Sequence, residues 1–193
     1  MIIKAAFQRT IAWRRIVPIL LRVTLSTVSV ASPLQSLEAS AAQQRTADER
    51  IVAACIARSA AGRGWLEKTL WGLRDQEGGW IGAEIANSDG SHDLGPLQVN
   101  SWWVPRLAAV TGRPERHIRH WLKQDACFNV EAARWIFLSG LAVTRDYWKA
   151  IGAYHSPTVW RQRRYAGSVA TKLRGRFGAV IFDAGKAASD ATN

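Results

Sequence analysis

The chain has 193 residues and two cysteines, and its 26 Lys and Arg against 15 Asp and Glu give a formal net charge of +11. Without a leader and a tail, about 130 to 150 residues remain, enough for one domain around a single core. The basic balance could suit nucleic acid, but no RNP motif, zinc finger or glycine-rich phosphate loop accompanies it, so we expect no nucleic-acid partner.

Residues 1–31 resemble a signal peptide, with five Lys or Arg, no Asp or Glu, and small residues up to Ala31. Arg22 interrupts the apolar segment, so cleavage as late as residue 41 is also considered. Removal of residues 1–31 takes away five positive charges and no negative ones, which leaves +6. We expect a periplasmic protein; the alternative is a leader that is never removed and tethers the chain to the membrane surface.

Residues 32–45 are predicted to be a linker before the first helix of the domain. Thr46 and Glu49 have the spacing of a capping box, so this helix should start near Ala47 and end near the glycines at 62–64. We therefore place the domain at residues 46–175.

The two cysteines, Cys55 and Cys127, form an even pair in a chain that looks exported, which predicts a disulfide. Two reduced, buried thiols are the alternative.

The stretch from Gln76 to Trp103 concentrates the chemistry. Glu77 follows an amphipathic run of leucines and precedes Gly78 and Gly79, so we place it in the last turn of a helix. A carboxyl group there, beside Trp80 and at the edge of a core, should be partly desolvated, which raises its pKa and keeps it protonated near neutrality. Such a group can donate a proton to a glycosidic oxygen.

A hairpin should follow, with strands at residues 81–86 and 92–99 joined by an Asp-Gly turn. It would carry a second carboxylate, Asp93, across a cleft from Glu77. The alternation after residue 96 predicts that Gln98 and Asn100 share one face, where two amides would suit the acetamido and hydroxyl groups of a sugar.

The rest of the chain is predicted to be helical. Helices are expected at residues 102–110 and 115–123, then at 130–144 with Asn129 as N-cap, and at 159–173 after the start signal Ser156-Pro157. Residues 176–193 are predicted to form a tail. The fold class is therefore mostly α, with one small hairpin.

Ten tryptophans are many for this length. Burial is the commoner use of Trp, and stacking on sugar faces is another. Trp80 and Trp102, which flank the central stretch, are candidates for sugar binding. Four others are assigned to the core: Trp65, Trp71, Trp121 and Trp135.

The chain resembles the goose-type and bacterial lytic transglycosylases, in particular the small specialised ones that accompany secretion, conjugation and pilus machines. The resemblance spans residues 48–173 and rests on four motifs in the family's order: Glu77-Gly-Gly-Trp80, Asn87-Ser-Asp-Gly-Ser-His-Asp93 running on to Trp103, Asp125-Ala-Cys-Phe-Asn129, and Gly152-Ala-Tyr154-His-Ser156. Two positions depart from the family: Gly78 replaces its usual Ser, and His155 replaces the Asn after Tyr154.

The resemblance implies an α+β lysozyme-like fold and cleavage of peptidoglycan by a monomer that needs no cofactor or metal. Glu77 would protonate the bridging oxygen and then take the proton from the sugar's own 6-hydroxyl, which leaves a 1,6-anhydro ring. Gln98, Asn100 and Tyr154 would hold the sugar, and Asp93 would stabilise positive charge or hold the hairpin.

Two alternatives remain open. The segment from Asp89 to Gly95 is also similar to the active-site hairpin of animal c-type lysozymes, where the matching Asp is the second catalytic carboxylate, so hydrolysis by Glu77 and Asp93 is the rival reaction. The other alternative is a wall-binding or scaffold module in which catalysis is incidental.

Overall fold

A computed structural model describes residues 33–182, so the predicted signal peptide and the end of the predicted tail lie outside the described residues. The described part is mostly helical with one small antiparallel sheet, which confirms the predicted fold class. Its elements in chain order are α1 (Pro33–Ala60), α2 (Gly64–Glu77), β1 (Glu84–Ala86), β2 (His92–Leu94), β3 (Val99–Asn100), the 3₁₀ helix η1 (Ser101–Trp103), α3 (Val104–Thr111), α4 (Glu115–Gln124), α5 (Ala126–Thr144), α6 (Tyr147–His155), α7 (Val159–Phe177) and the 3₁₀ helix η2 (Ala179–Phe182).

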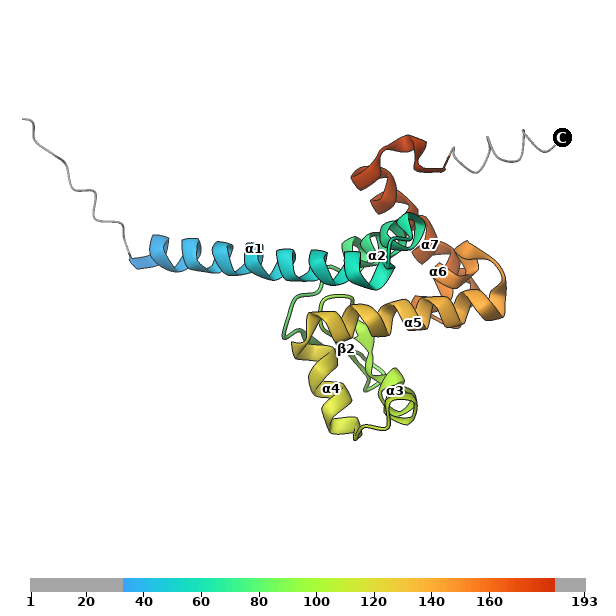
Figure 1. The fold of residues 1–193 in the computed structure, drawn as a ribbon, viewed down its shortest axis with the longest axis horizontal. Helices are drawn as coiled ribbons and strands as arrows, with labels where there is room; N and C mark the ends of the chain where they lie inside the picture. Colours follow the sequence, from blue (N-terminus) through green and yellow to red (C-terminus); the bar gives the residue numbers. More distant parts are fainter. Residues whose placement is uncertain (1–32, 183–193) are drawn as a thin grey trace, which may run out of the picture.

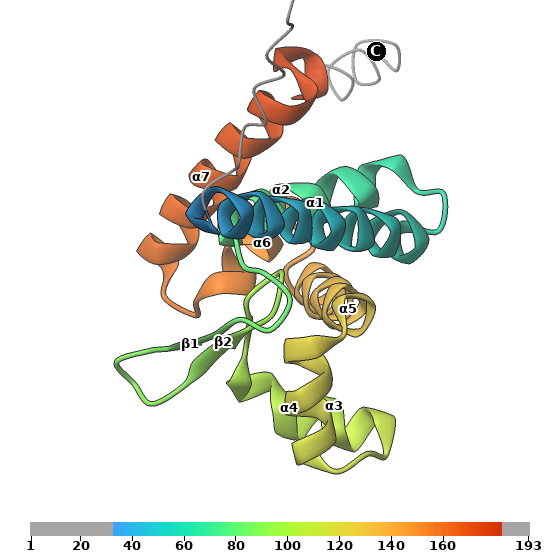
Figure 2. The ribbon, with the colours of Figure 1, turned by 90° about the vertical axis from the view of Figure 1, so that its left-hand side faces the viewer.

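The helix α5 lies at the centre and contacts α1, α2, α4, α6 and β3 (Figure 1). It is the one described helix long and apolar enough to cross a membrane by length and composition, but here its Phe137 and Ile136 are buried in the domain core. Figure 2 shows the sheet and the α3–α4 pair on one side of α5, with α2, α6 and α7 on the other. The sheet contacts α4 through β2 and α5 through β3.

The helix α1 differs from the prediction, because it runs unbroken from Pro33 through the expected linker. Thr46 does not cap a helix start; its hydroxyl donates to the carbonyl of Ala42, 2.9 Å away within the same helix. After Pro33 the segment is rich in Ala and holds no Gly or Pro, so nothing in it stops a helix. The first half of α1 projects from the body of the molecule (Figure 1).

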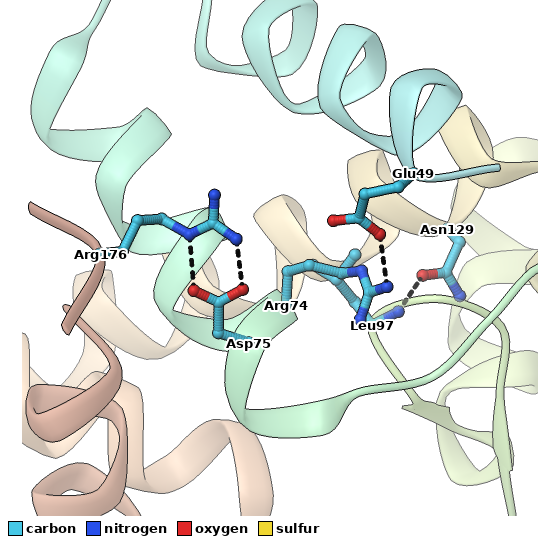
Figure 3. Close-up of polar contacts among 6 residues, drawn as sticks. All are labelled: Glu49, Arg74, Asp75, Leu97, Asn129 and Arg176. Atoms are coloured by element: carbon cyan, nitrogen blue, oxygen red, sulfur yellow. Dashed lines mark hydrogen bonds and ion pairs between the residues drawn. The ribbon is translucent and has the colours of Figure 1, made fainter. Parts of the chain in front are cut away.

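The predicted disulfide is present between Cys55 of α1 and Cys127 of α5, with 4.8 Å between the two Cα atoms. A second tie to α1 is the ion pair between Arg74 of α2 and Glu49, 2.7 Å long (Figure 3). These two bonds fix α1 to the helices on both of its sides.

The helix α5 begins earlier than predicted, since its N-cap is Asp125, whose side chain accepts from the backbone N–H groups of Cys127 and Phe128. Asn129 is therefore not a cap but a fully buried residue inside the helix. The interpretation failed because Asp125 offers the same capping chemistry four residues earlier.

The end of the chain also differs from the prediction. Ser156 terminates α6 rather than starting the next helix, and α7 begins at Val159. It then runs past residue 175 to Phe177, because Arg176 binds Asp75 of α2 through two 2.6 Å hydrogen bonds (Figure 3) and lies over the ring of Trp71. Residues 176–182 are thus structured.

Of the four tryptophans assigned to the core, three pack partly buried against it: Trp71, Trp121 and Trp135. Trp65 does not, because it lies in the first turn of α2 with 48% of its surface exposed, and its ring is tilted against Phe137 with 6.4 Å between the centroids.

Candidate active site

Glu77 is the last residue of α2, as the sequence predicts. Gly78 follows with a φ of 61°, and its N–H closes the helix on the carbonyl of Arg74. This left-handed conformation suits glycine because it has no Cβ. Leu70 and Leu73, both fully buried, lie one and two turns before Glu77 on the same face of α2, so the Glu77 side chain is directed toward the core from a rigid helix end.

Gly79 brings the chain after Glu77 against the segment that precedes β3. A Cβ on Gly79 would meet the Gly95 carbonyl oxygen at 2.2 Å and the Gln98 amide nitrogen at 2.7 Å. A Cβ on Gly95 would in turn meet the Leu122 carbonyl oxygen at 2.1 Å. These two glycines let α2, the sheet segment and α4 approach each other closely beneath the site.

Asn129 of α5 joins the sheet segment to α4. Its side-chain oxygen accepts from the Leu97 N–H at 2.9 Å (Figure 3), and its amide nitrogen donates to the carbonyls of Leu94 and Leu122 at 2.7 and 2.8 Å. All three bonds are buried, so each one satisfies a backbone group that water cannot reach. Asn129 therefore holds the turn between β2 and β3 in place.

The environment of Glu77 raises its pKa from 4.5 to about 7. Burial is the main cause; the hydroxyl of Tyr165, which donates to Glu77 Oε1, lowers the pKa, and the nearby charge of Asp93 raises it. Burial and then the Glu77 charge hold the pKa of Tyr165 well above its ordinary value, so this phenol remains a donor at neutral pH. A carboxyl group with a pKa near 7 can both give and take a proton at neutrality.

Asp93 lies in the middle of β2, opposite Ile85 of β1 and Asn100 of β3. The Asn100 amide nitrogen donates to Asp93 Oδ1 and to Ser91 Oγ, each at 2.9 Å. The side chain of Asp93 is thus held on the sheet, within electrostatic range of Glu77. The turn before β2 forms as predicted, with Gly90 at a φ of 83°.

Gln98 and Asn100 do not share the face of one strand, which corrects the prediction. Gln98 lies in the turn before β3 with a φ of 46°, and its amide nitrogen donates to the Gly95 carbonyl at 2.8 Å. The alternation misled because β3 has only two residues. The Asn100 side chain has a second role besides its bonds to Asp93 and Ser91, because its oxygen accepts from the Trp102 N–H and so caps η1.

Tyr154 of α6 contacts the turn that holds Gln98. Its hydroxyl donates to the Leu97 carbonyl at 2.9 Å, and its pKa is well above the ordinary value because of burial and the charges of Glu77 and Asp93. Tyr154 therefore positions the turn before β3 next to the two carboxylates.

The two tryptophans suggested for sugar binding are exposed, with 56% of Trp80 and 72% of Trp102 open to solvent. Trp80 follows the glycines after α2, and Trp102 lies in η1 directly after β3. Both segments adjoin the site residues, so these indole faces are free to stack on a ligand.

Tyr165 is the site residue that the sequence analysis missed. It is 88 positions from Glu77 and lies in α7 after a run of arginines, where the pattern favours a solvated helix face. It is nevertheless 6% exposed, and the His155 ring stacks on it at 4.7 Å and 3°. The one signal in the sequence that could have identified Tyr165 as a buried residue is that it is an aromatic side chain with a hydroxyl group directly after a run of arginines.

Other parts of the described chain offer no comparable chemistry. Within residues 33–182, no three His, Cys, Asp or Glu side chains are grouped so that they could hold a metal ion. A hollow of about 470 Å³ adjoins the disulfide. Its two carboxylates are engaged, Asp125 in capping α5 and Glu131 in binding Arg134 and Ser59.

No protein-family model matches the chain. Two proteins called invasion protein IagB, from Salmonella typhimurium strains SL1344 and LT2, are each 30% identical to it over 129 residues, which cover 64% of this chain and 78% of each relative. Invasion protein IagB of Salmonella typhi is 31% identical over 105 residues, or 52% of this chain and 62% of that relative.

Proposed function

The chain belongs to the family of invasion protein IagB, and we propose that it is a peptidoglycan lytic transglycosylase. In this proposal it cleaves the β-1,4 bond between N-acetylmuramic acid and N-acetylglucosamine and leaves a 1,6-anhydro end. The observation that carries the proposal is Glu77, a carboxyl group with a pKa of about 7 at a rigid helix end, hydrogen-bonded to a buried tyrosine.

The reaction begins with Glu77 protonated. It gives its proton to the bridging oxygen, and the C1–O bond breaks as positive charge develops on the muramic acid ring. Asp93, fixed by Asn100, stabilises that charge from the sheet. Glu77, now a carboxylate, takes the proton from the 6-hydroxyl of the same sugar, whose oxygen bonds to C1, so no water is consumed.

The substrate residues are proposed on the same basis. Trp80 and Trp102 offer exposed ring faces, while Gln98, Asn100 and Tyr154 shape the turn that adjoins both carboxylates. The enzyme acts as a periplasmic monomer. It opens the wall locally for a secretion, conjugation or pilus machine, as the resemblance to the specialised transglycosylases implies.

A second reaction, hydrolysis, is favoured by one observation. Asp93 is oriented by a hydrogen bond and raises the pKa of Glu77 through its charge, so the two carboxylates interact. A lysozyme uses such a pair, with the second carboxylate as nucleophile or stabiliser. In that case water would replace the 6-hydroxyl.

Mass spectrometry of the fragments released from purified peptidoglycan tests both reactions, with the chain from residue 32 onward and its Glu77→Gln and Asp93→Asn variants. Products one water lighter than hydrolysed fragments, lost in Glu77→Gln and only reduced in Asp93→Asn, are expected for the transglycosylase. Reducing-end products abolished by either substitution would establish the lysozyme. A wild-type protein that binds the wall but releases nothing would point to the binding module.

A further inference from the structure

The site around Glu77 is rich in acids and poor in cations. The groups whose pKa it shifts, Glu77, Tyr154 and Tyr165, respond to one another and to Asp93, and to no cation in the described residues. His155 is the exception. Burial lowers its pKa most, the charge of Asp93 raises it, and the charge of Arg161 lowers it. Arg161 also lies one turn before Tyr165 on the same face of α7, which places this cation next to the residue that binds Glu77.

The corner between α6 and α7 fixes where Arg161 lies. The Gln162 amide nitrogen donates to the Ser156 carbonyl at 2.9 Å, and a Cβ on Gly152 would meet Gln162 Cβ at 2.5 Å. The start of α7 is thus packed tightly on the end of α6. His155, stacked on Tyr165, and Arg161 accordingly lie at one rigid corner beside the hydrogen bond to Glu77.

Arg161 is exposed and makes no ion pair among the described residues. Its guanidinium lies over the Trp160 ring, 5.4 Å from the centroid, which orients the cation without neutralising it. Two other arginines are neutralised by carboxylates, Arg176 by Asp75 and Arg134 by Glu131. An unpaired, oriented guanidinium at the edge of an acidic site is suited to an anionic ligand.

We propose that Arg161, supported by the His155 ring, forms a subsite for a carboxylate of the glycan substrate. The inference rests on the proposed function and adds to it a preference among glycans. Each muramic acid carries a lactyl group whose carboxyl is either free or joined to a peptide that bears carboxylates of its own, whereas N-acetylglucosamine oligomers are neutral. Substrate carboxylates approaching the charge of Asp93 would be repelled, and Arg161 offsets that repulsion.

Calorimetric titration of the Glu77→Gln variant, which binds without turnover, tests the subsite. The ligands are a peptide-bearing muropeptide oligomer, the same glycan without its peptides, and an N-acetylglucosamine oligomer of equal length. Adding Arg161→Gln should raise Kd about tenfold for the carboxylate-bearing glycans, the loss of one good ion pair, and leave Kd for the neutral oligomer unchanged. Added salt should diminish the difference.

Arg163→Gln is the matched control, because Arg163 is also exposed but lies about 200° further around α7. It should change the affinity neither for the carboxylate-bearing glycans nor for the neutral oligomer. Arg161→Lys should bind the carboxylate-bearing glycans more tightly than Arg161→Gln does. An effect on both carboxylate-bearing glycans shows that the subsite accepts either carboxylate, an effect on the peptide-free glycan alone assigns the free lactyl carboxylate, and an effect on the peptide-bearing one alone assigns the carboxylates of the peptide.

An equal loss for charged and neutral ligands, or none for either, would overturn the subsite while leaving the proposed function intact. If the Glu77→Gln protein binds no glycan at all, the proposed function fails instead.

Discussion

Replacing Tyr165 with Phe removes the hydroxyl that donates to Glu77 Oε1 and leaves the buried ring in place. A hydrogen bond to an ionised carboxylate is worth about 1 kcal/mol more than one to a neutral group, so its loss should raise the pKa of Glu77 by about one unit. The starting value is about 7. Since the first step needs protonated Glu77, the variant should retain activity to higher pH.

The assay is kcat/KM on solubilised glycan strands between pH 5 and pH 9. The alkaline limb of the wild-type profile should fall with an apparent pKa near 7, and that of Tyr165→Phe about one unit higher. At pH 8 the protonated fraction of Glu77 then rises from about one tenth to about one half.

Tyr154→Phe is the control, because the Tyr154 hydroxyl donates to the Leu97 carbonyl and not to Glu77. It should change the rate without moving the alkaline limb. A limb that stays in place in Tyr165→Phe, or moves to lower pH, would refute the conclusion that the Tyr165 hydroxyl lowers the pKa of Glu77.

Three further predictions concern stability. Native Glu77 keeps its proton between its ordinary pKa of 4.5 and about 7, whereas the unfolded chain has lost it. The wild type should therefore lose up to about 3 kcal/mol of unfolding free energy as the pH rises across that window, and Glu77→Gln should not. Urea unfolding at pH 5 and pH 8 measures this, and an equal pH dependence of the unfolding free energy in the two proteins would contradict the pKa shift. Asn129→Ala leaves three buried backbone groups unpaired and should cost about 3 to 4 kcal/mol in the same experiment, and a cost below 1 kcal/mol would show that water replaces the amide. Replacing Cys55 and Cys127 together with Ala opens a loop of 72 residues and should cost about 4 kcal/mol on the chain-entropy argument, whereas a midpoint equal to that of the oxidised wild type would show that the ion pair to Glu49 suffices to hold α1.

The features that sequence analysis predicted correctly are those with a local cause. Glu77 lies at a helix end because Gly78 and Gly79 cannot continue the helix, and this can be read from three adjacent residues. The hairpin was predictable from its Asp-Gly turn in the same way. The raised pKa of Glu77 followed from its place at the edge of the core.

The features that were missed or misjudged depend on distant parts of the chain. Asn is a residue type that often caps helices. Asn129 is instead buried and bonds to residues 94, 97 and 122, which only the folded chain brings close to it. Tyr165 contacts Glu77 across 88 positions, and nothing near it in the sequence indicates a partner. Gln98 was misplaced because a turn with a positive φ interrupts an alternation typical of a strand.

The bond from Tyr165 to Glu77 also has a consequence during synthesis. Glu77 emerges with α2, but α7, which packs against α2, is completed about 100 residues later. Until α7 docks on α2 the carboxyl group is less buried, and since burial is the main cause of its raised pKa, it is ionised to a greater extent at neutral pH and is a poorer source of protons. An incomplete chain is therefore a poor proton donor, and Glu77 reaches its full pKa only when α7, the last long helix, is in place.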